Sequence, residues 1–560
     1  MSSYTAGVVT TGLLSRHRAR PALVATGVVI VLLCFVLATP RSGGPDEASH
    51  MVASAALVRG EVDGDVVVEN PALRTFDIPL MVGFPDPGCW AQQPQVPAGC
   101  APEPPADNPD VPRATTSYNY PPWAYVLPGL ASFVAPPDWY AYLARLFMAV
   151  IPVALVCASL ARARRIGRGA AVAVLVGLTP IAWFSMSIVN PSAVAIAGGL
   201  ALWAALLVPR PGTFDVLLVA GWVATLLPRR DGPIWATLIV LAVCLLVRRS
   251  PRDLFRSTIV STRVVLAAAL VLPPATALFN EQRGLNLLLS LAPLSLVGVD
   301  ALCRLWSRFP ERRTRLALSL SAVAVGTVVL ALAVAARPGG YDPTVTRIVV
   351  GKSGEHLRQL VGVLGWLDTP APLIAVFAFW SLFGILLAAA LIEAPRVAAV
   401  GAGAIAAVVV TAWILELGQG DPGGTYWQGR YSMPFVVGLP LAIAVRARSS
   451  TETSGSERPG DSSILSTGRV AVVLAIAVWA IWNLTFVAAL HRWGAGLDGT
   501  WPPGSWESWD APLGPVALIV LHAIGTSVLV YSQVGPVGRV TADPEERDDT
   551  VPVVTTGVTA

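Results

Sequence analysis

Long apolar runs, separated by short polar or arginine-rich segments, fill most of this 560-residue chain. A helical run of about 20 apolar residues matches the thickness of the hydrocarbon core of a bilayer. Run length and flanking charge therefore predict an all-α integral membrane protein with about 14 (12–14) transmembrane helices. The predicted spans are 22–40, 139–160, 169–189, 192–208, 214–228, 232–248, 263–280, 285–303, 315–336, 371–392, 396–416, 431–446, 468–490 and 512–532.

Besides the predicted outer segment 337–370, two long polar segments interrupt this pattern. The first, 41–138, follows the first span and is predicted to be a long extracytoplasmic loop. Within it, 121–135 is apolar but short and proline-rich, which predicts a re-entrant or interfacial helix rather than a span. The second, 491–511, is rich in tryptophan and is predicted to be another outer loop.

The composition agrees with a membrane protein. Hydrophobic residues make up 54% of the chain and charged residues only 13%, about half the share in soluble domains. The net charge of +4 is small and gives no indication of nucleic-acid binding.

Arginine sets the predicted orientation, because loops rich in arginine and lysine stay in the cytoplasm. The basic loops are 161–168, 248–263, 304–315 and 446–463. This predicts both termini in the cytoplasm and the segment 41–138 outside, in a multi-pass membrane protein.

The same pattern divides the chain into five parts. A cytoplasmic tail, 1–21, precedes a transmembrane core, 22–446, which includes the first outer loop. A flexible cytoplasmic linker, 447–467, leads to a transmembrane hairpin, 468–532, with the tryptophan-rich loop between its helices. The polar segment 533–560 is predicted to be a disordered cytoplasmic tail.

The stretch "RSGGPDEASHM" carries two acids where the first span leaves the membrane. One interpretation is a cap: Asp46 would begin an amphipathic helix on the membrane surface, with Glu47 in its first turn. The other is functional: Asp46 or Glu47 would act as a general base or bind a divalent cation such as Mg or Mn, with His50 one turn further on. The sequence alone leaves both open.

Several polar residues are predicted to lie at the outer ends of spans. Paired guanidinium groups can hold a phosphate, although Asp231 could instead neutralise one member of the pair Arg229 and Arg230. Arg145 either snorkels to the interface or pairs with an outer carboxylate. The remaining candidates for substrate binding are Tyr120 in an aromatic stretch, Asn190 at a helix start, and Gln428 and Arg430 in "QGRY".

Cys89 and Cys100 lie in the predicted outer loop, outside the reducing cytoplasm, where a disulfide between them is favoured over two free thiols. The chain has no P-loop, nucleophile elbow, HExxH, zinc-type cysteine spacing or Rossmann fingerprint. Chemistry driven by cytoplasmic nucleotides is therefore not expected.

Six stretches in a fixed order carry a family resemblance: "GGPDEASHM", "YNYPPWAYVLPG", "YLARLFMAV", "NPSAVAIA", "LLPRRDG" and "QGRYSMPFVVGLPL". Together they resemble the bacterial family of polytopic membrane proteins of unknown function number 2142. That family is in turn similar to the GT-C glycosyltransferases, which use polyprenyl-phosphate sugars. The resemblance covers about residues 20–490.

This resemblance implies a GT-C-like fold and a function. Asp46 occupies the position of the GT-C acid that serves as base or metal contact, with Glu47 as its neighbour, and outer arginines would hold the leaving phosphate. The implied partners are the lipid bilayer, a polyprenyl-phosphate-linked sugar and a glycan acceptor. The alternatives are a transporter or flippase for a lipid or glycan, and a non-catalytic scaffold of an envelope-synthesis complex.

Overall fold

The computed structural model describes residues 6–104, 107–210, 212–256, 258–278, 283–307, 343–419, 427–452, 468–501 and 511–535. The predicted span 315–336, most of the predicted linker 447–467, part of the tryptophan-rich loop and most of the tail 533–560 lie outside these residues. Of the linker, the described part is helical to Glu452, and α1 already begins at Ala6 within the predicted N-terminal tail.

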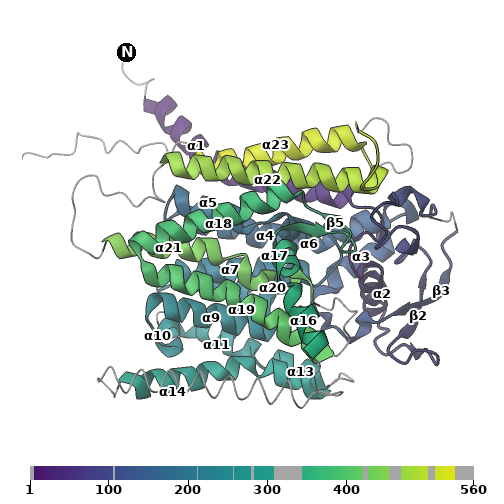
Figure 1. Cartoon of the computed structure of the whole chain (residues 1–560), viewed down its shortest axis with the longest axis horizontal. Helices are drawn as coiled ribbons and strands as arrows, with labels where there is room; N and C mark the ends of the chain where they lie inside the picture. The colour runs from purple at the N-terminus through teal and green to yellow at the C-terminus, as the bar shows by residue number, and fades with distance from the viewer. Residues whose placement is uncertain are drawn as a thin grey trace, which may run out of the picture.

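The chain folds as a bundle of helices that lie side by side, with the segment 41–138 against one end (Figure 1). The longest helices are α1 (Ala6–Ala38), α4 (Tyr140–Arg164), α18 (Leu373–Glu393), α19 (Pro395–Gln419), α22 (Gly468–Ala495) and α23 (Pro515–Val534). The shorter ones of the bundle are α5 (Arg168–Gly177), α6 (Pro180–Met186), α7 (Ser192–Leu207), α8 (Val216–Leu226), α9 (Gly232–Val247), α10 (Pro251–Arg256), α11 (Val260–Ala269), α12 (Leu272–Leu278), α13 (Arg283–Ser290), α14 (Ser295–Ser307), α16 (Pro343–Gly351), α17 (Ser353–Gly362), α20 (Gly429–Val436) and α21 (Leu439–Glu452).

Seven helices in the described part of the chain are long and apolar enough to cross a membrane, or eight if one bent pair counts as a span. That pair is α5 and α6, which meet at 72° within the predicted span 169–189. Three further predicted spans, 192–208, 214–228 and 232–248, correspond to the shorter apolar helices α7, α8 and α9. The chain is thus a mostly helical protein with several candidate spans.

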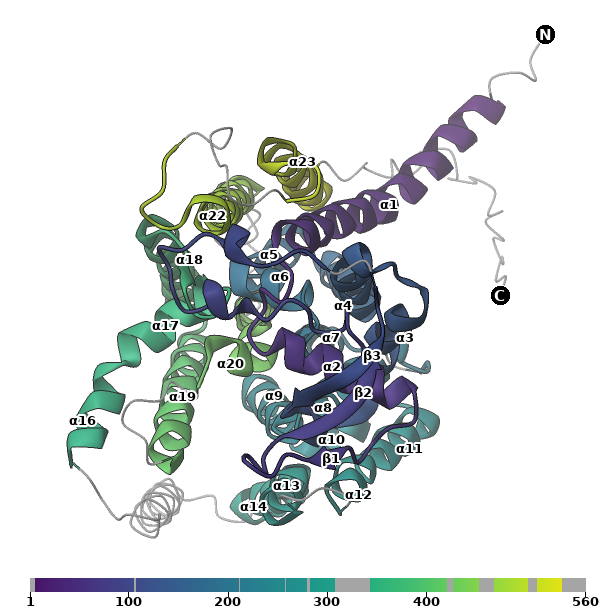
Figure 2. The ribbon, with the colours of Figure 1, turned by 90° about the vertical axis from the view of Figure 1, so that its right-hand side faces the viewer.

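The outer segment departs from the all-α prediction. Strands β1 (Asp65–Val66), β2 (Arg74–Pro79) and β3 (Asp110–Thr115) form an antiparallel sheet in the order β1-β2-β3. It lies beside α2 (Glu47–Val58) at the end of the bundle that faces the viewer in Figure 2. The strands were missed because they are short and interrupted by proline, which weakens a strand pattern.

Short elements complete the outer segments. Helix α3 (Val126–Val134) has nine residues, too few to span, as predicted for 121–135. A second small sheet pairs β4 (Val363–Leu364) with β5 (Thr369–Pro370). The 3-10 helices are Pro87–Cys89, Ala98–Cys100, Ser117–Asn119, Pro122–Ala124, Pro137–Trp139 and Ala292–Leu294.

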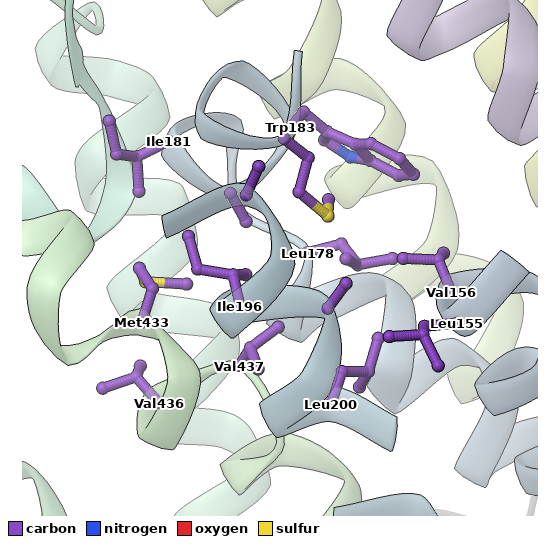
Figure 3. Close-up of a cluster of buried hydrophobic side chains, with 14 of the residues drawn as sticks. Leu155, Val156, Leu178, Ile181, Trp183, Ile196, Leu200, Met433, Val436 and Val437 are labelled. Atoms are coloured by element: carbon purple, nitrogen blue, oxygen red, sulfur yellow. The ribbon is translucent and has the colours of Figure 1, made fainter. Parts of the chain in front are cut away.

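The core forms where α4, the α5–α6 bend, α7 and α20 meet, and Figure 3 shows its side chains. Glycine lets the backbones approach closely there: a Cβ at Gly199 in α7 would lie 2.0 Å from the carbonyl oxygen of Pro434 in α20. This contact fixes α20, and with it Arg430, against the centre of the bundle.

The predicted disulfide between Cys89 and Cys100 is present. It closes a loop that wraps around Arg492 near the end of α22. The Nη atoms of Arg492 donate to the carbonyls of Trp90, Gln93 and Val96. Arg492 also pairs with Asp368 at 2.9 Å. The outer loop is therefore anchored to the C-terminal hairpin.

Candidate functional site

Asp46 and Arg430 form an ion pair at the end of the bundle covered by the outer loop. Arg430 Nη2 donates to Asp46 Oδ2 at 2.9 Å, and its Nη1 donates to the carbonyl of Pro45. Arg430 is buried, whereas the Asp46 side chain is 48% exposed. The carboxylate of Asp46 thus remains accessible, and among the described residues the buried Nε of Arg430 has no hydrogen-bond partner.

The predicted capping role of Asp46 is wrong. Asp46 does precede α2, but its backbone is left-handed, with φ at 61°, and its side chain makes no capping hydrogen bond. The predicted surface helix is also wrong, because both faces of α2 are covered by protein and its residues from His50 to Ala56 are buried. Local capping therefore does not explain the first acid of "PDEASH".

Glu47 has quite different surroundings. Its carboxylate is fully buried and pairs with Arg145, which donates from Nε at 2.8 Å and Nη2 at 2.7 Å. The backbone amides of Gly44 and Val189 donate to the same carboxylate. Arg145 also donates to the carbonyls of Val36, Thr39 and Pro40.

This network decides between the two interpretations of Arg145: it partners an outer carboxylate and does not snorkel. With both of its oxygens held by donors, Glu47 has no capacity left for a substrate or a cation. We therefore interpret Glu47 and Arg145 as positioning residues, which tie the first span to α2 and α4 beneath Asp46.

His50 contacts the aromatic stretch rather than the acids. Its Nδ1 lies 2.7 Å from the hydroxyl of Tyr125, and its ring meets that of Tyr120 edge to face. Burial lowers the pKa of His50 to about 3, an effect that Asp46 opposes and that Arg430 and Arg229 reinforce. His50 is therefore neutral, and it helps to place Tyr120 in the site.

The arginine pair of the α8–α9 turn lies in the same region. Arg229 is buried and pairs with Asp231 at 2.8 Å, so the alternative in which Asp231 neutralises one arginine is confirmed. Its guanidinium also lies 4.5 Å from the centre of the Tyr431 ring, next to Arg430. Arg230 donates to the carbonyl of Asn119 and lies over the ring of Tyr120.

The charges of this cluster favour an anion. Burial opposes the charged form of Arg229, but Asp231 and the neighbouring tyrosines outweigh it and raise the pKa of this arginine. Burial raises the pKa of the Tyr120 hydroxyl, so Tyr120 remains protonated. Around Tyr120 and Tyr431, the guanidinium groups of Arg229, Arg230 and Arg430 thus outnumber the carboxylates of Asp46 and Asp231.

Asn190 contacts the backbone beside the cluster, and Gln428 lies two residues before Arg430. Asn190 Oδ1 accepts from the amide of Ser192 at the start of α7, as expected for a residue at a helix start. Its Nδ2 donates to the carbonyl of Pro45, beside Asp46. Gln428 precedes α20, and its buried Oε1 has no partner among the described residues.

A cavity of about 310 Å³ opens beside the cluster. Arg229, Arg230 and Tyr120 line it together with Tyr118 and Glu61, and α12 and α13 close it with Thr276, Asn286 and Ser290. Glu61, Asn286 and Ser290 were not predicted from the sequence. A signal for Asn286 existed, since an amide within an apolar predicted span is costly unless it has a function.

The described residues do not fit a divalent-cation site. No group of three or more His, Cys, Asp or Glu side chains gathers among them in a way that could hold a metal ion. Asp46 is paired with Arg430, and Glu47 is saturated by donors.

Comparison with known proteins identifies a family. The model of a family described as "Predicted membrane protein (DUF2142)" matches residues 29–439. No curated protein and no solved structure matches the chain significantly. The matched segment contains every residue of the cluster.

Proposed function

The chain belongs to the DUF2142 family of predicted membrane proteins, and from this premise we propose that it is a membrane glycosyltransferase. It would transfer a sugar from a polyprenyl-phosphate donor to a cell-envelope glycan or glycolipid on the extracytoplasmic face of a bacterial plasma membrane. The observation that carries the proposal is the meeting of an accessible carboxylate, Asp46, with a buried arginine cluster beside a cavity.

Asp46 is proposed as the general base. In a single displacement, the acceptor hydroxyl attacks the anomeric carbon of the donor, its proton passes to the Asp46 carboxylate, and the bond to the phosphate oxygen breaks with its electron pair. The half-exposed carboxylate suits this role because a base must reach the proton it removes. Arg430 holds it in place.

The arginine cluster is proposed to stabilise the departing phosphate. Positive groups fixed before the reaction stabilise charge that develops on the leaving group at little further cost. Arg430 offers the unused Nε, while Arg230 adds charge at the cavity wall beside the Arg229–Asp231 pair. Such a phosphate must sit near the membrane surface, since its lipid tail remains in the bilayer.

The positions of the basic segments in the fold support an extracytoplasmic location for the Asp46 cluster. Figure 1 shows the basic segment α10 and the end of α21 at the opposite end of the bundle from α2 and the three-stranded sheet. Basic loops favour the cytoplasmic side, so the Asp46 cluster would face outward with both termini inside.

The test is a transfer assay with the full chain in vesicles. Vesicles carry polyprenyl-phosphate mannose or polyprenyl-phosphate glucose, envelope extract serves as acceptor, and released polyprenyl phosphate is measured. Release should fall at least about 100-fold in Asp46→Asn, the scale of a lost general base. Equal release with and without the wild-type chain would overturn the proposal.

A further inference from the structure

We propose that the cavity of about 310 Å³ receives the sugar ring of the donor, and that Asn286 determines which sugar fits by binding one of its hydroxyl groups. This rests on the proposed function and deepens it, because it assigns the place and the chemical class of the transferred group: a neutral sugar with free hydroxyls, attached to a phosphate.

The first feature that points to a sugar ligand is the side chain of Asn286. Its side chain lines the cavity although the residue is only 6% exposed. Its Oδ1 is buried with no hydrogen-bond partner in the described part of the chain. A buried amide oxygen without a partner costs about 1–3 kcal/mol, so such a group is expected to meet a donor from a ligand.

The second feature is the set of polar residues near Asn286 in the cavity lining. Ser290 lies one helical turn further along α13 and lines the same cavity. Glu61, which follows α2, adds a carboxylate to the wall. Acceptor oxygens from two separate elements suit a ligand that offers several hydroxyl donors.

The α8–α9 turn supplies positively charged donors to the cavity, in contrast to the acceptor oxygens of the other wall. Arg230 lines the cavity as a cation beside the Arg229–Asp231 pair, and Tyr118 and Tyr120 supply aromatic walls. A sugar ring presents polar edges and apolar C–H faces, while its anomeric phosphate is anionic. The lining therefore has a matching group for each part of a sugar phosphate, and the volume is in the range of small-ligand sites.

The experiment measures binding by the purified full chain in detergent. The probes are glucose 1-phosphate, mannose 1-phosphate and galactose 1-phosphate, with methyl phosphate as the sugar-free comparison. The wild type should bind at least one of the three at least about tenfold more tightly than methyl phosphate. Asn286→Ala should lose this preference and keep its affinity for methyl phosphate, because a site built around a hydroxyl group discriminates through it.

Two variants control for damage to the cavity. Thr276→Val lies on the same wall, but its hydroxyl is bonded to carbonyls of its own helix, so the sugar preference should persist. Asn286→Asp keeps an acceptor oxygen and should retain more of the preference than Asn286→Ala. If Asn286→Ala does not fold, Glu61→Gln tests the other acceptor of the lining and should weaken the sugar preference.

The inference is overturned if the wild type binds no hexose 1-phosphate better than methyl phosphate, or if Asn286→Ala leaves the preference unchanged. Farnesyl phosphate is the lipid comparison. If it binds more tightly than every hexose 1-phosphate and Asn286→Ala does not change this, the cavity holds the lipid and the inference is overturned as well. Asp46→Asn should keep the sugar preference, so these failures are separate from loss of transfer activity.

Discussion

Asp46 and Glu47 are neighbours in the chain, yet their carboxylates have opposite surroundings. Glu47 is fully buried among four donor groups, while Asp46 has one ion pair and a half-exposed side chain. The sequence predicted that this pair matters and that Arg145 could partner an outer acid. Only the family resemblance placed Asp46 ahead of Glu47, because the surroundings that distinguish them depend on Arg145 and Arg430, 98 and 384 residues away.

Glu47→Gln should destabilise the protein. Removing one charge of a buried pair leaves Arg145 uncompensated, at a cost of about 3–5 kcal/mol. The measurement is thermal unfolding in detergent. Glu103→Gln is the control, because Glu103 pairs with Arg41 at the surface and is 87% exposed, so little change is expected. Equal unfolding temperatures for both variants would contradict the buried network.

The burial of His50 predicts that the free energy of unfolding depends on pH. In the unfolded chain its pKa is about 6.5, and in the folded protein burial lowers it to about 3. The unfolded state therefore binds the proton first, and stability is lost as the pH falls below about 6.5. The wild type should lose about 2 kcal/mol more than His50→Gln between pH 7 and pH 5. Denaturant unfolding at both pH values measures this, and parallel losses would refute it.

The α7–α20 pair shows what was predictable for an element. Apolar runs predicted both helices, and Asn190 was expected at the start of α7. The bend between α5 and α6 was not expected, because a continuous apolar run does not reveal a break of 72°. Nor did hydropathy reveal the sheet next to α2. Close packing of helix on helix, as at Gly199, is a tertiary property that the local pattern does not encode.

Gly199→Ala should reduce both stability and sugar transfer. The added methyl group would meet the Pro434 carbonyl and push α20 from α7, which displaces Arg430. Overpacking of this kind costs about 1–3 kcal/mol. Gly403→Ala in α19 is the matched control, because its Cβ would meet nothing within 4 Å. Thermal unfolding and the vesicle assay compare them; identical behaviour of the two variants would disprove the role of this contact.

At the scale of the whole molecule, hydropathy and arginine placement predicted a multi-pass membrane protein with a large outer segment, and the family match supports the membrane assignment. The predicted Cys89–Cys100 bond is confirmed. Only the family resemblance could predict that three stretches, "PDEASH", "PRRDG" and "QGRY", lie together in the fold. Their spacing in the chain carries no information about which helices are neighbours. The cavity was not predicted at all.

Orientation can be tested by labelling engineered cysteines in intact cells, in a chain with Cys303→Ser. Glu69→Cys, exposed in the outer segment, should react with a membrane-impermeant maleimide. Arg252→Cys, exposed in α10, should react only after permeabilisation, because its basic segment is predicted to be cytoplasmic. The reverse pattern would place Asp46 inside and contradict the proposed outer site.

The most direct test of the central claim is the envelope glycan composition of the cells that carry this protein. A deletion strain receives the wild type, Asp46→Asn, or Asp138→Asn, an exposed acid of the same outer segment. With normal protein levels, we expect Asp46→Asn to show the same missing sugar as the deletion, while Asp138→Asn restores it. A complete glycan profile in cells with Asp46→Asn would contradict the assignment of Asp46 as the catalytic base.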